Sequence, residues 1–221
     1  PTPVPFVCPT VPVFAFPPML GDVAPNMVAA TVWVTNGFIL TNYTAAGAPI
    51  SGFPLPLGFV LPGPLTGLGF GAGILWITDG AMIAGIAPPP APGCLAGPPL
   101  VVVPPWPLPA AMPGPILDVA YDPATATLWA SSAVGGLVGN LLIGGGVGPG
   151  GVFPGLGACP LGPALTGIAV DTTKPGFFGP APALYVTDGV MIARISPPGP
   201  PAALTFYAPV ACYPFPGAPL S

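Results

Sequence analysis

Apolar side chains alternate with small or polar ones in a short segment that recurs along the chain. The segment reads LWIT at 75–78 and LYVT at 184–187, with looser copies VWVT at 32–35 and LWAS at 128–131. A period of two places successive side chains on opposite faces of a strand. Each copy therefore predicts a β-strand with an aromatic residue inside it, and these aromatics are Trp33, Trp76, Trp129 and Tyr185.

A turn dipeptide follows three of the four copies. The dipeptides are Asn36-Gly37, Asp79-Gly80 and Asp188-Gly189. Asn-Gly and Asp-Gly supply the positive φ values of a type I′ turn, so these stretches predict strand, tight turn, strand. In the remaining copy the place is taken by Ser-Ser-Ala at 131–133 with glycines at 135 and 136, and a longer, looser turn is expected there.

The pattern extends to a longer repeat. The phrase LYVTDGVMIARI at 184–195 matches LWITDGAMIAGI at 75–86 in eight of twelve positions, and an apolar segment precedes each aromatic one. The aromatics are spaced by 43, 53 and 56 residues, which suits propellers and solenoids with loop insertions. The predicted units are 19–62, 63–113, 114–162 and 163–215, after an extended N-terminal segment, 1–18.

Further apolar runs, such as 100–103 and 203–207, bring each unit to four strands. Four-stranded antiparallel repeats with an aromatic and a turn dipeptide are typical of β-propeller blades, whereas a β-sandwich needs no internal repeat. We therefore predict an all-β fold: a small β-propeller of about four blades with Pro-rich links, forming one domain over 1–221. The pattern leaves open whether the ring closes within one chain or is shared by two.

The segments VWVTNG at 32–37 and LYVTDG at 184–189 resemble the strand-and-turn signature of YVTN-type and NHL-type β-propeller repeats. LTGIAVD at 165–171 is similar to the strand that precedes that signature. Because YVTN-like repeats occur in cell-surface layer proteins and other secreted proteins, the resemblance implies a surface or extracellular location. The chain departs from these families in its low blade number, its many prolines and its scarcity of charge.

Proline and glycine are unusually frequent, with 41 Pro and 33 Gly among 221 residues. Such a content without a period is typical of disorder. The repeat and the 52% hydrophobic residues favour a folded chain instead. We expect the prolines in links and edge strands, where they remove N–H donors and discourage the addition of further strands.

Charged residues make up only 4% of the chain, against about a quarter in ordinary soluble domains. Six Asp oppose Lys174 and Arg194, giving a net charge of −4. Two isolated cations exclude a nucleic-acid partner, because phosphate binding needs clustered Lys or Arg. Pro and Gly interrupt every apolar stretch, so no membrane-spanning helix is expected. A surface with so few ions favours homo-oligomers or polymers.

Four cysteines lie far apart in the sequence, at Cys8, Cys94, Cys159 and Cys212. They form no close pairs of the kind that bind zinc, and two structural disulfides fit better, which implies an oxidising compartment. Three connectivities are possible. We favour Cys8 with Cys212, since that bond joins the two ends of a ring; free buried cysteines are the alternative.

The chain lacks His and Glu, the usual general acids and bases besides Asp. Asp79 and Asp188 belong to turns, and Asp122 and Asp171 follow strands where turns begin. Asp22 and Asp118 occupy equivalent positions and are expected to face a common axis. A Ca²⁺ site there would need several converging oxygens, and hydrogen bonding of such carboxylates to backbone N–H groups is commoner. We predict no enzyme, no cofactor and no metal site.

Two other features of the sequence are candidate sites. Asn42-Tyr43-Thr44 is an N-glycosylation sequon. We expect Asn42 to be exposed just after the first hairpin, where it is a candidate site for glycosylation. The four recurring aromatics can stack on sugars, but one aromatic per repeat at one strand position favours packing in the blade core.

These observations favour an extracellular structural protein that assembles with copies of itself into a filament, tube or layer through an almost uncharged, apolar and Pro-rich surface. The alternative is a secreted propeller that binds a glycan or peptide. We expect the first to polymerise and the second to be monomeric.

Overall fold

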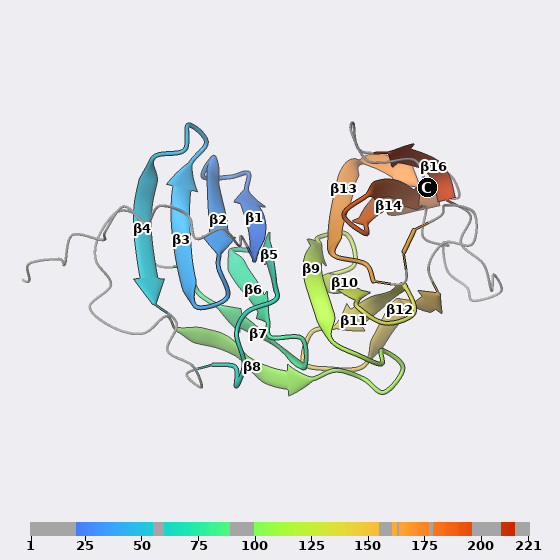
Figure 1. The fold of residues 1–221 in the computed structure, drawn as a ribbon, viewed down its shortest axis with the longest axis horizontal. Helices are drawn as coiled ribbons and strands as arrows, with labels where there is room; N and C mark the ends of the chain where they lie inside the picture. Colours follow the sequence, from blue (N-terminus) through green and yellow to red (C-terminus); the bar gives the residue numbers. More distant parts are fainter. Residues whose placement is uncertain are drawn as a thin grey trace, which may run out of the picture.

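The computed structural model describes residues 21–54, 60–88, 100–154, 161–162, 164–176, 179–195 and 209–214, with the backbone alone for 51–54, 154, 172–176, 179–182 and 209–210. These residues contain sixteen strands and no helix. The strands form four separate four-stranded sheets set around a centre, as blades of a propeller (Figure 1). The prediction of an all-β, four-bladed propeller is confirmed.

Each blade is an antiparallel meander whose strands pair in chain order. The first contains β1 (Asp22–Asn26), β2 (Thr31–Thr35), β3 (Ile39–Thr44) and β4 (Pro49–Pro54). The second contains β5 (Gly67–Gly71), β6 (Ile74–Thr78), β7 (Met82–Ile86) and β8 (Val101–Pro107). The third contains β9 (Ile116–Asp122), β10 (Thr127–Ser132), β11 (Leu137–Leu142) and β12 (Val147–Pro154). The fourth contains β13 (Gly167–Gly176), β14 (Gly179–Thr187), β15 (Met191–Ile195) and β16 (Pro209–Pro214).

Each sheet falls within one of the predicted repeat units. The outer strand of the fourth blade is Pro209–Pro214, whereas the apolar run expected to form it, 203–207, lies outside the described residues, as does the segment 1–18.

The first strand of each blade lies nearest the centre, and small residues allow these strands to approach one another. A Cβ on Gly67 of β5 would lie 2.6 Å from the Cα of Asp118 on β9, and one on Gly69 would lie 2.5 Å from the carbonyl oxygen of Val119. Both obstacles are backbone atoms that cannot rotate away. Glycine is therefore needed on this face of β5 to let blades two and three pack together.

Prolines are concentrated on the outer strands, each of which ends with a proline. The middle strands β2, β3, β6, β7, β10, β11 and β15 contain none, and the exception among the middle strands is β14, with Pro180 and Pro182. A proline on an edge strand has no N–H to offer to a further strand, whereas in a middle strand it would remove a ladder hydrogen bond. The outer edges of the blades are thereby protected against uncontrolled strand addition, as the composition predicts.

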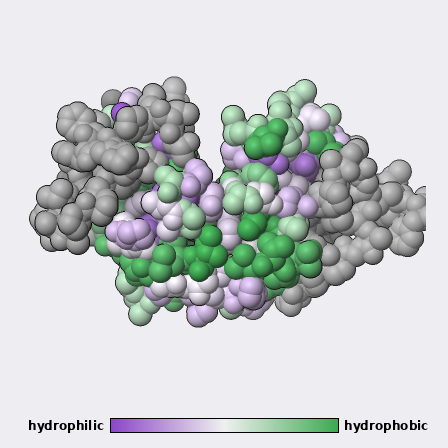
Figure 2. All heavy atoms as spheres, turned by 180° about the vertical axis from the view of Figure 1, so that it is seen from behind, coloured by the Kyte–Doolittle hydropathy of each residue, from purple (hydrophilic) through white to green (hydrophobic). Residues whose placement is uncertain are grey.

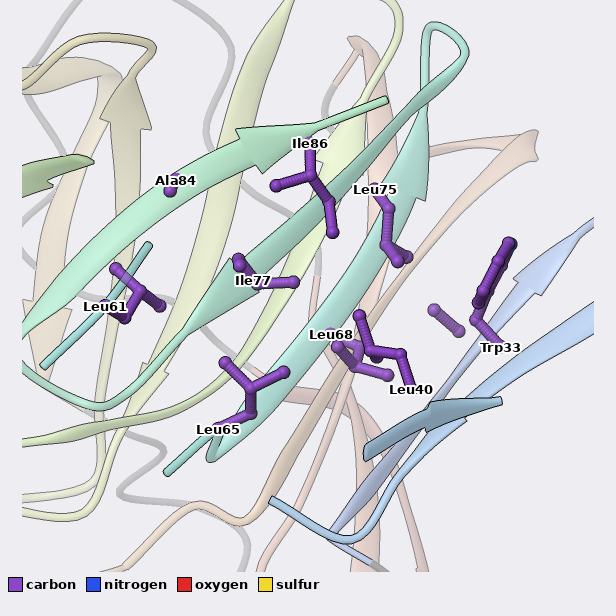
Figure 3. Packing of buried hydrophobic residues seen from close by; sticks show 10 residues of the cluster. Trp33, Leu40, Leu61, Leu65, Leu68, Leu75, Ile77, Ala84 and Ile86 are labelled. Carbon is purple, nitrogen blue, oxygen red and sulfur yellow. The ribbon is translucent and has the colours of Figure 1, made fainter. Parts of the chain in front are cut away.

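Three apolar clusters fill the spaces between successive blades. Trp33 of the first blade packs with Leu68 and Leu75 of the second (Figure 3). Trp76 packs with residues of the third blade and stacks on Tyr121, with ring centroids 6.2 Å apart and planes 9° apart. Trp129 packs with residues of the fourth. Replacing a buried tryptophan with alanine costs about 3–5 kcal/mol, so these side chains hold neighbouring blades together.

The turns between second and third strands differ from the prediction. A type I′ turn needs positive φ at both central residues, but in these turns only the glycines have it, with φ of 95°, 92° and 87° at Gly37, Gly80 and Gly189. Thr35 pairs with Leu40, which leaves four residues between them instead of two. The prediction of a two-residue type I′ turn was therefore wrong: side-chain hydrogen bonds shape a longer loop.

Candidate functional site

The centre of the propeller holds a pair of carboxyl groups. Asp22 begins β1 and Asp118 lies on β9, while the equivalent positions in the second and fourth blades are Gly67 and Gly167. Aspartate and glycine thus alternate around the axis. The glycines leave room in which the carboxylates of the first and third blades extend toward their neighbours.

Each carboxylate accepts two backbone hydrogen bonds in the same pattern. Oδ1 accepts from the N–H of the following residue, at 2.7 Å in both cases: Val23 for Asp22 and Val119 for Asp118. Oδ2 accepts from the next blade: Leu68 N–H donates to Asp22 at 2.5 Å, and Ile168 N–H donates to Asp118 at 2.7 Å. One aspartate therefore ties blade one to blade two, and the other ties blade three to blade four.

The two carboxyl groups are also hydrogen-bonded to each other across the axis. Such a bond needs a proton on one of them, because two ionised carboxylates have only acceptors. Burial raises the pKa of Asp118 well above the usual 3.8, and the negative charge of Asp22 raises it further. Burial also raises the pKa of Asp22, against the lowering effect of the hydrogen bonds from Asp118, Leu68 and Val23. Below the raised pKa of Asp118 the pair therefore holds one proton between its two carboxyl groups and links blades one and three.

The surroundings of the pair limit its chemistry. No cluster of three or more His, Cys, Asp or Glu side chains occurs within the described part of the chain, whereas Ca²⁺ takes six to eight oxygen ligands. The oxygens of Asp22 and Asp118 already accept backbone N–H groups. The arrangement is therefore that of a clasp that joins all four blades.

Two further aspartates fix the links between blades. Oδ1 of Asp79 accepts from Ala81 and Met82 at 3.0 and 2.9 Å, which shapes the β6–β7 turn, and Oδ2 accepts from Gly63 N–H at 3.0 Å. Asp188 repeats the arrangement in the fourth blade, where its Oδ2 accepts from Gly162 N–H at 2.6 Å. Oδ1 of Asn36 accepts the same turn bonds, from Phe38 and Ile39 N–H, and no link bond to it occurs among the described residues.

The sequence interpretation missed the threonine before each turn dipeptide. The hydroxyls of Thr35, Thr78 and Thr187 accept from the N–H of Gly37, Gly80 and Gly189 at 2.9 to 3.0 Å. Thr78 and Thr187 also donate to the carbonyls of Met82 and Met191. The recurrence of Thr before each dipeptide was the available indication, since hydroxyls often bond the backbone two residues on.

Asp122 connects a loop with the core of the third blade. It accepts from Ala124 N–H at 2.9 Å and from the Thr125 hydroxyl at 2.8 Å, and Trp129 Nε1 donates to it at 3.4 Å. Asp171 lies half-buried on β13. Asp122 ends β9 where the predicted turn begins, whereas the turn expected at Asp171 is wrong, because β13 continues past it to Gly176.

The remaining predicted residues fall in different places. Trp33, Trp76 and Trp129 are buried, and Tyr185 is half-buried. Asn42 was expected to be exposed after the hairpin, but it is half-buried within β3, because the strand continues to Thr44. Cys212 lies on β16 and is disulfide-bonded. The other three cysteines lie outside the described residues, so the pairing stays a prediction.

Large apolar side chains are exposed at both ends of the propeller. Phe38, Val134 and Val190 stand at the turns between second and third strands. Met27 and Val28 are exposed at the opposite end, in the β1–β2 loop. Apolar residues also form a band across the face seen in Figure 2. No helix in the described part of the chain is long and apolar enough to span a membrane.

Comparison with known proteins identifies the fold and no family. No protein-family model matches the chain, and no curated protein is similar to it. Among solved structures, it is similar to the hemopexin-fold protein CP4 from cow pea, at 12% identity over 90% of this chain and 94% of that one, with a TM-score of 0.53. A 2S albumin seed protein from Dolichos matches at 13% identity over 89% and 94% of the chains, with a TM-score of 0.51.

A third structure, virginiamycin B lyase from Staphylococcus aureus, is 17% identical over 84% of this chain, with a TM-score of 0.45. The chain spans only 52% of that protein. At 12 and 13% identity, the similarities to the cow pea and Dolichos proteins show the fold alone.

Proposed function

We propose that this protein is an extracellular structural module that assembles with copies of itself into a filament, tube or layer. The proposal rests on the way the fold uses its charges. Backbone N–H groups inside the molecule donate hydrogen bonds to Asp22, Asp79, Asp118, Asp122 and Asp188. With charged residues making up only 4% of the chain and a net charge of −4, the electrostatic repulsion between copies is weak.

The exposed apolar side chains supply the attraction. Val28 is 97% exposed and Met27 84% exposed, and Phe38 and Val190 are each about half exposed at the other end. Burial of apolar surface contributes roughly 25 cal/mol per Å². Contacts between copies would remove this surface from water without the cost of desolvating charged groups.

The prolines of the outer strands limit how copies can assemble. An outer strand that ends in prolines and lacks N–H donors there is a poor template for a strand from another copy. Assembly through side-chain surfaces is therefore favoured over the addition of strands at blade edges. The disulfide at Cys212 fits an oxidising compartment, which supports an extracellular location.

Sedimentation velocity and electron microscopy of the purified chain over a range of concentrations test the proposal. We expect concentration-dependent oligomers that persist or grow at high salt, because salt screens charge pairs but does not weaken apolar burial. A particle that stays monomeric at the highest attainable concentration would refute the proposal and favour the binding module, which saturable binding on a glycan array would then support.

A further inference from the structure

The four blades offer four interfaces, and equivalent residues are buried at only three of them. The residue after each axial Asp or Gly faces the preceding blade. Leu68, Val119 and Ile168 occupy this position in blades two to four and are 2%, 1% and 7% exposed. Val23 occupies it in blade one and is 51% exposed. The side of blade one that faces blade four is therefore uncovered.

Other positions on the same side of the blades follow the same rule. Val32 is half-buried, whereas its equivalents Leu75, Leu128 and Leu184 are fully buried. Tyr43, which pairs with Val32, is half-buried as well. The equivalents of Tyr43 are fully buried: Ile86, Leu141 and Ile195. We call the surface formed by Val23, Val32 and Tyr43 wall one.

The residues of blade four that face blade one are also less buried than their equivalents in the other three blades. The aromatic of each repeat faces the following blade, and Tyr185 is half-buried where the three tryptophans are buried. Ile192 of β15 is also half-buried, and its equivalents are fully buried: Leu40, Ile83 and Val138. We call the surface formed by Tyr185 and Ile192 wall four. Arg194 pairs with Tyr185 across β14 and β15 and so lies on the same face.

These exposures place an open seam between blades four and one. In Figure 1, β1 and β13 stand apart, whereas β5 and β9 approach closely. No apolar cluster bridges the seam within the described part of the chain, in contrast to the other three interfaces.

We infer that wall four of one copy binds wall one of a second copy. This inference rests on the proposed self-assembly and identifies its contact surface. The chemistry of the two walls is that of the three closed interfaces, where an aromatic and an aliphatic residue of one blade cover aliphatic residues of the next. Every copy carries both walls, so a second copy offers a matching partner.

A contact of this kind is heterologous, because each copy contributes a different surface. A chain of such contacts has a free wall one at one end and a free wall four at the other. Further copies can therefore add at both ends, and the assembly either closes into a ring or extends as an open filament. The open seam thus accounts for both the attraction and its direction.

A charge placed in the seam tests the inference. Val23→Lys puts a cation on wall one, where it would be buried opposite the face that carries Arg194. Ala46→Lys adds the same charge at an exposed site in the β3–β4 turn, outside both walls and outside the exposed apolar side chains named above, and is the matched control. We expect Val23→Lys to raise the concentration needed for assembly at least about a hundredfold and Ala46→Lys to leave it near wild type.

Mixing two variants tests the direction of the contact. Ile192→Lys blocks wall four, so neither it nor Val23→Lys should assemble alone. A one-to-one mixture should form a dimer, because Val23→Lys retains wall four and Ile192→Lys retains wall one. Circular dichroism establishes whether each variant is folded. If Ile192→Lys does not fold, the comparison of Val23→Lys with its control still decides the question.

The outcomes separate the two proposals. A wild-type chain that never assembles refutes the proposed function and this inference with it. A wild-type chain that assembles while Val23→Lys assembles equally well refutes the inference alone. Assembly lost equally in Val23→Lys and Ala46→Lys also overturns it, since added charge by itself would then be the cause. If the wild-type chain is monomeric and binds a glycan or peptide saturably, and Val23→Lys does not bind it, the seam belongs to that ligand and the inference is wrong.

Discussion

Asp22 and Asp118 are hydrogen-bonded to each other across the centre of the propeller, although they belong to blades that are not neighbours. Each also accepts an N–H from the blade that follows its own. Two side chains therefore connect four blades. Because the seam between blades four and one lacks an apolar cluster within the described residues, this clasp ties together parts that packing alone leaves separate.

Stability should depend on the protonation of this clasp. The pKa of Asp118 is raised well above 3.8 in the folded state, so the folded chain holds a proton that the unfolded chain has released. The free energy of unfolding should therefore fall as the pH rises from about 3.8 through the folded-state pKa and level off above it. Urea denaturation across this range measures the effect.

The variant Asp22→Asn checks the assignment. It removes the charge that helps to raise the pKa of Asp118 and keeps an amide that can hydrogen-bond to Asp118. We expect a weaker pH dependence on this limb of the curve. A wild-type stability that is flat with pH, or an unchanged slope in Asp22→Asn, would contradict the shared proton.

Asp188 should act in the opposite direction. Burial raises its pKa, but the N–H groups of Gly162, Met191 and Val190 lower it below 3.8 overall. Its contribution is therefore present above about 3.8 and is lost as the pH falls through its folded-state pKa. Asp188→Asn should remove part of the acid-side loss of stability, which thermal unfolding at decreasing pH would show.

A methyl group at Gly67 should be poorly tolerated. It would lie 2.6 Å from the Cα of Asp118 and 2.8 Å from the carbonyl of Leu117, so the blades must move apart. Gly67→Ala should cost about 1–3 kcal/mol of unfolding free energy. Gly162→Ala is the control, because a Cβ there meets its nearest neighbour at 3.5 Å. Equal denaturation midpoints for the two variants would show that the close approach is not needed.

Three alanines have left-handed backbone conformations in first-to-second strand loops, with φ of 50°, 54° and 53° at Ala30, Ala72 and Ala126. A residue with a Cβ pays about 1–2 kcal/mol there, and glycine avoids this cost but loses chain entropy. Ala126→Gly should therefore raise stability by up to about 1 kcal/mol. Ala124→Gly, in the same exposed loop without positive φ, should lower it. Differential scanning calorimetry of both variants tests the contrast, and a loss of stability in Ala126→Gly would contradict it.

Oδ2 of Asp79 should contribute to stability through its hydrogen bond with Gly63 N–H, in the link that precedes β5. Asp79→Asn keeps the turn bonds through Oδ1 but replaces the acceptor for Gly63 N–H with an amide that cannot accept. We expect a loss of about 0.5–1.5 kcal/mol. Asn36→Asp keeps a side-chain oxygen for the turn bonds to Phe38 and Ile39 and should be nearly neutral by chemical denaturation. A neutral Asp79→Asn would show that the link bond does not contribute.

Much of the architecture could be predicted from the sequence, because strand alternation and turn dipeptides act locally. Alternation around Trp33, Trp76 and Trp129 located the second strand of three blades, and the repeat gave their number. The turn type was mispredicted because Thr35, Thr78 and Thr187 contribute hydroxyls that dipeptide preferences do not include. Asn42 was misplaced because its exposure depends on how far β3 extends.

The sequence by itself determined that Asp22 and Asp118 hold equivalent places and that the chain folds into repeated four-stranded sheets, since residue spacing sets which side chains share a face of a strand. Only the tertiary structure decided that these two carboxyls meet and share a proton, and that Val23 stays exposed where Leu68 and Val119 are covered. Burial and proton sharing depend on which elements approach in space. Identical local patterns therefore acquire different roles according to whether a neighbouring blade packs against them.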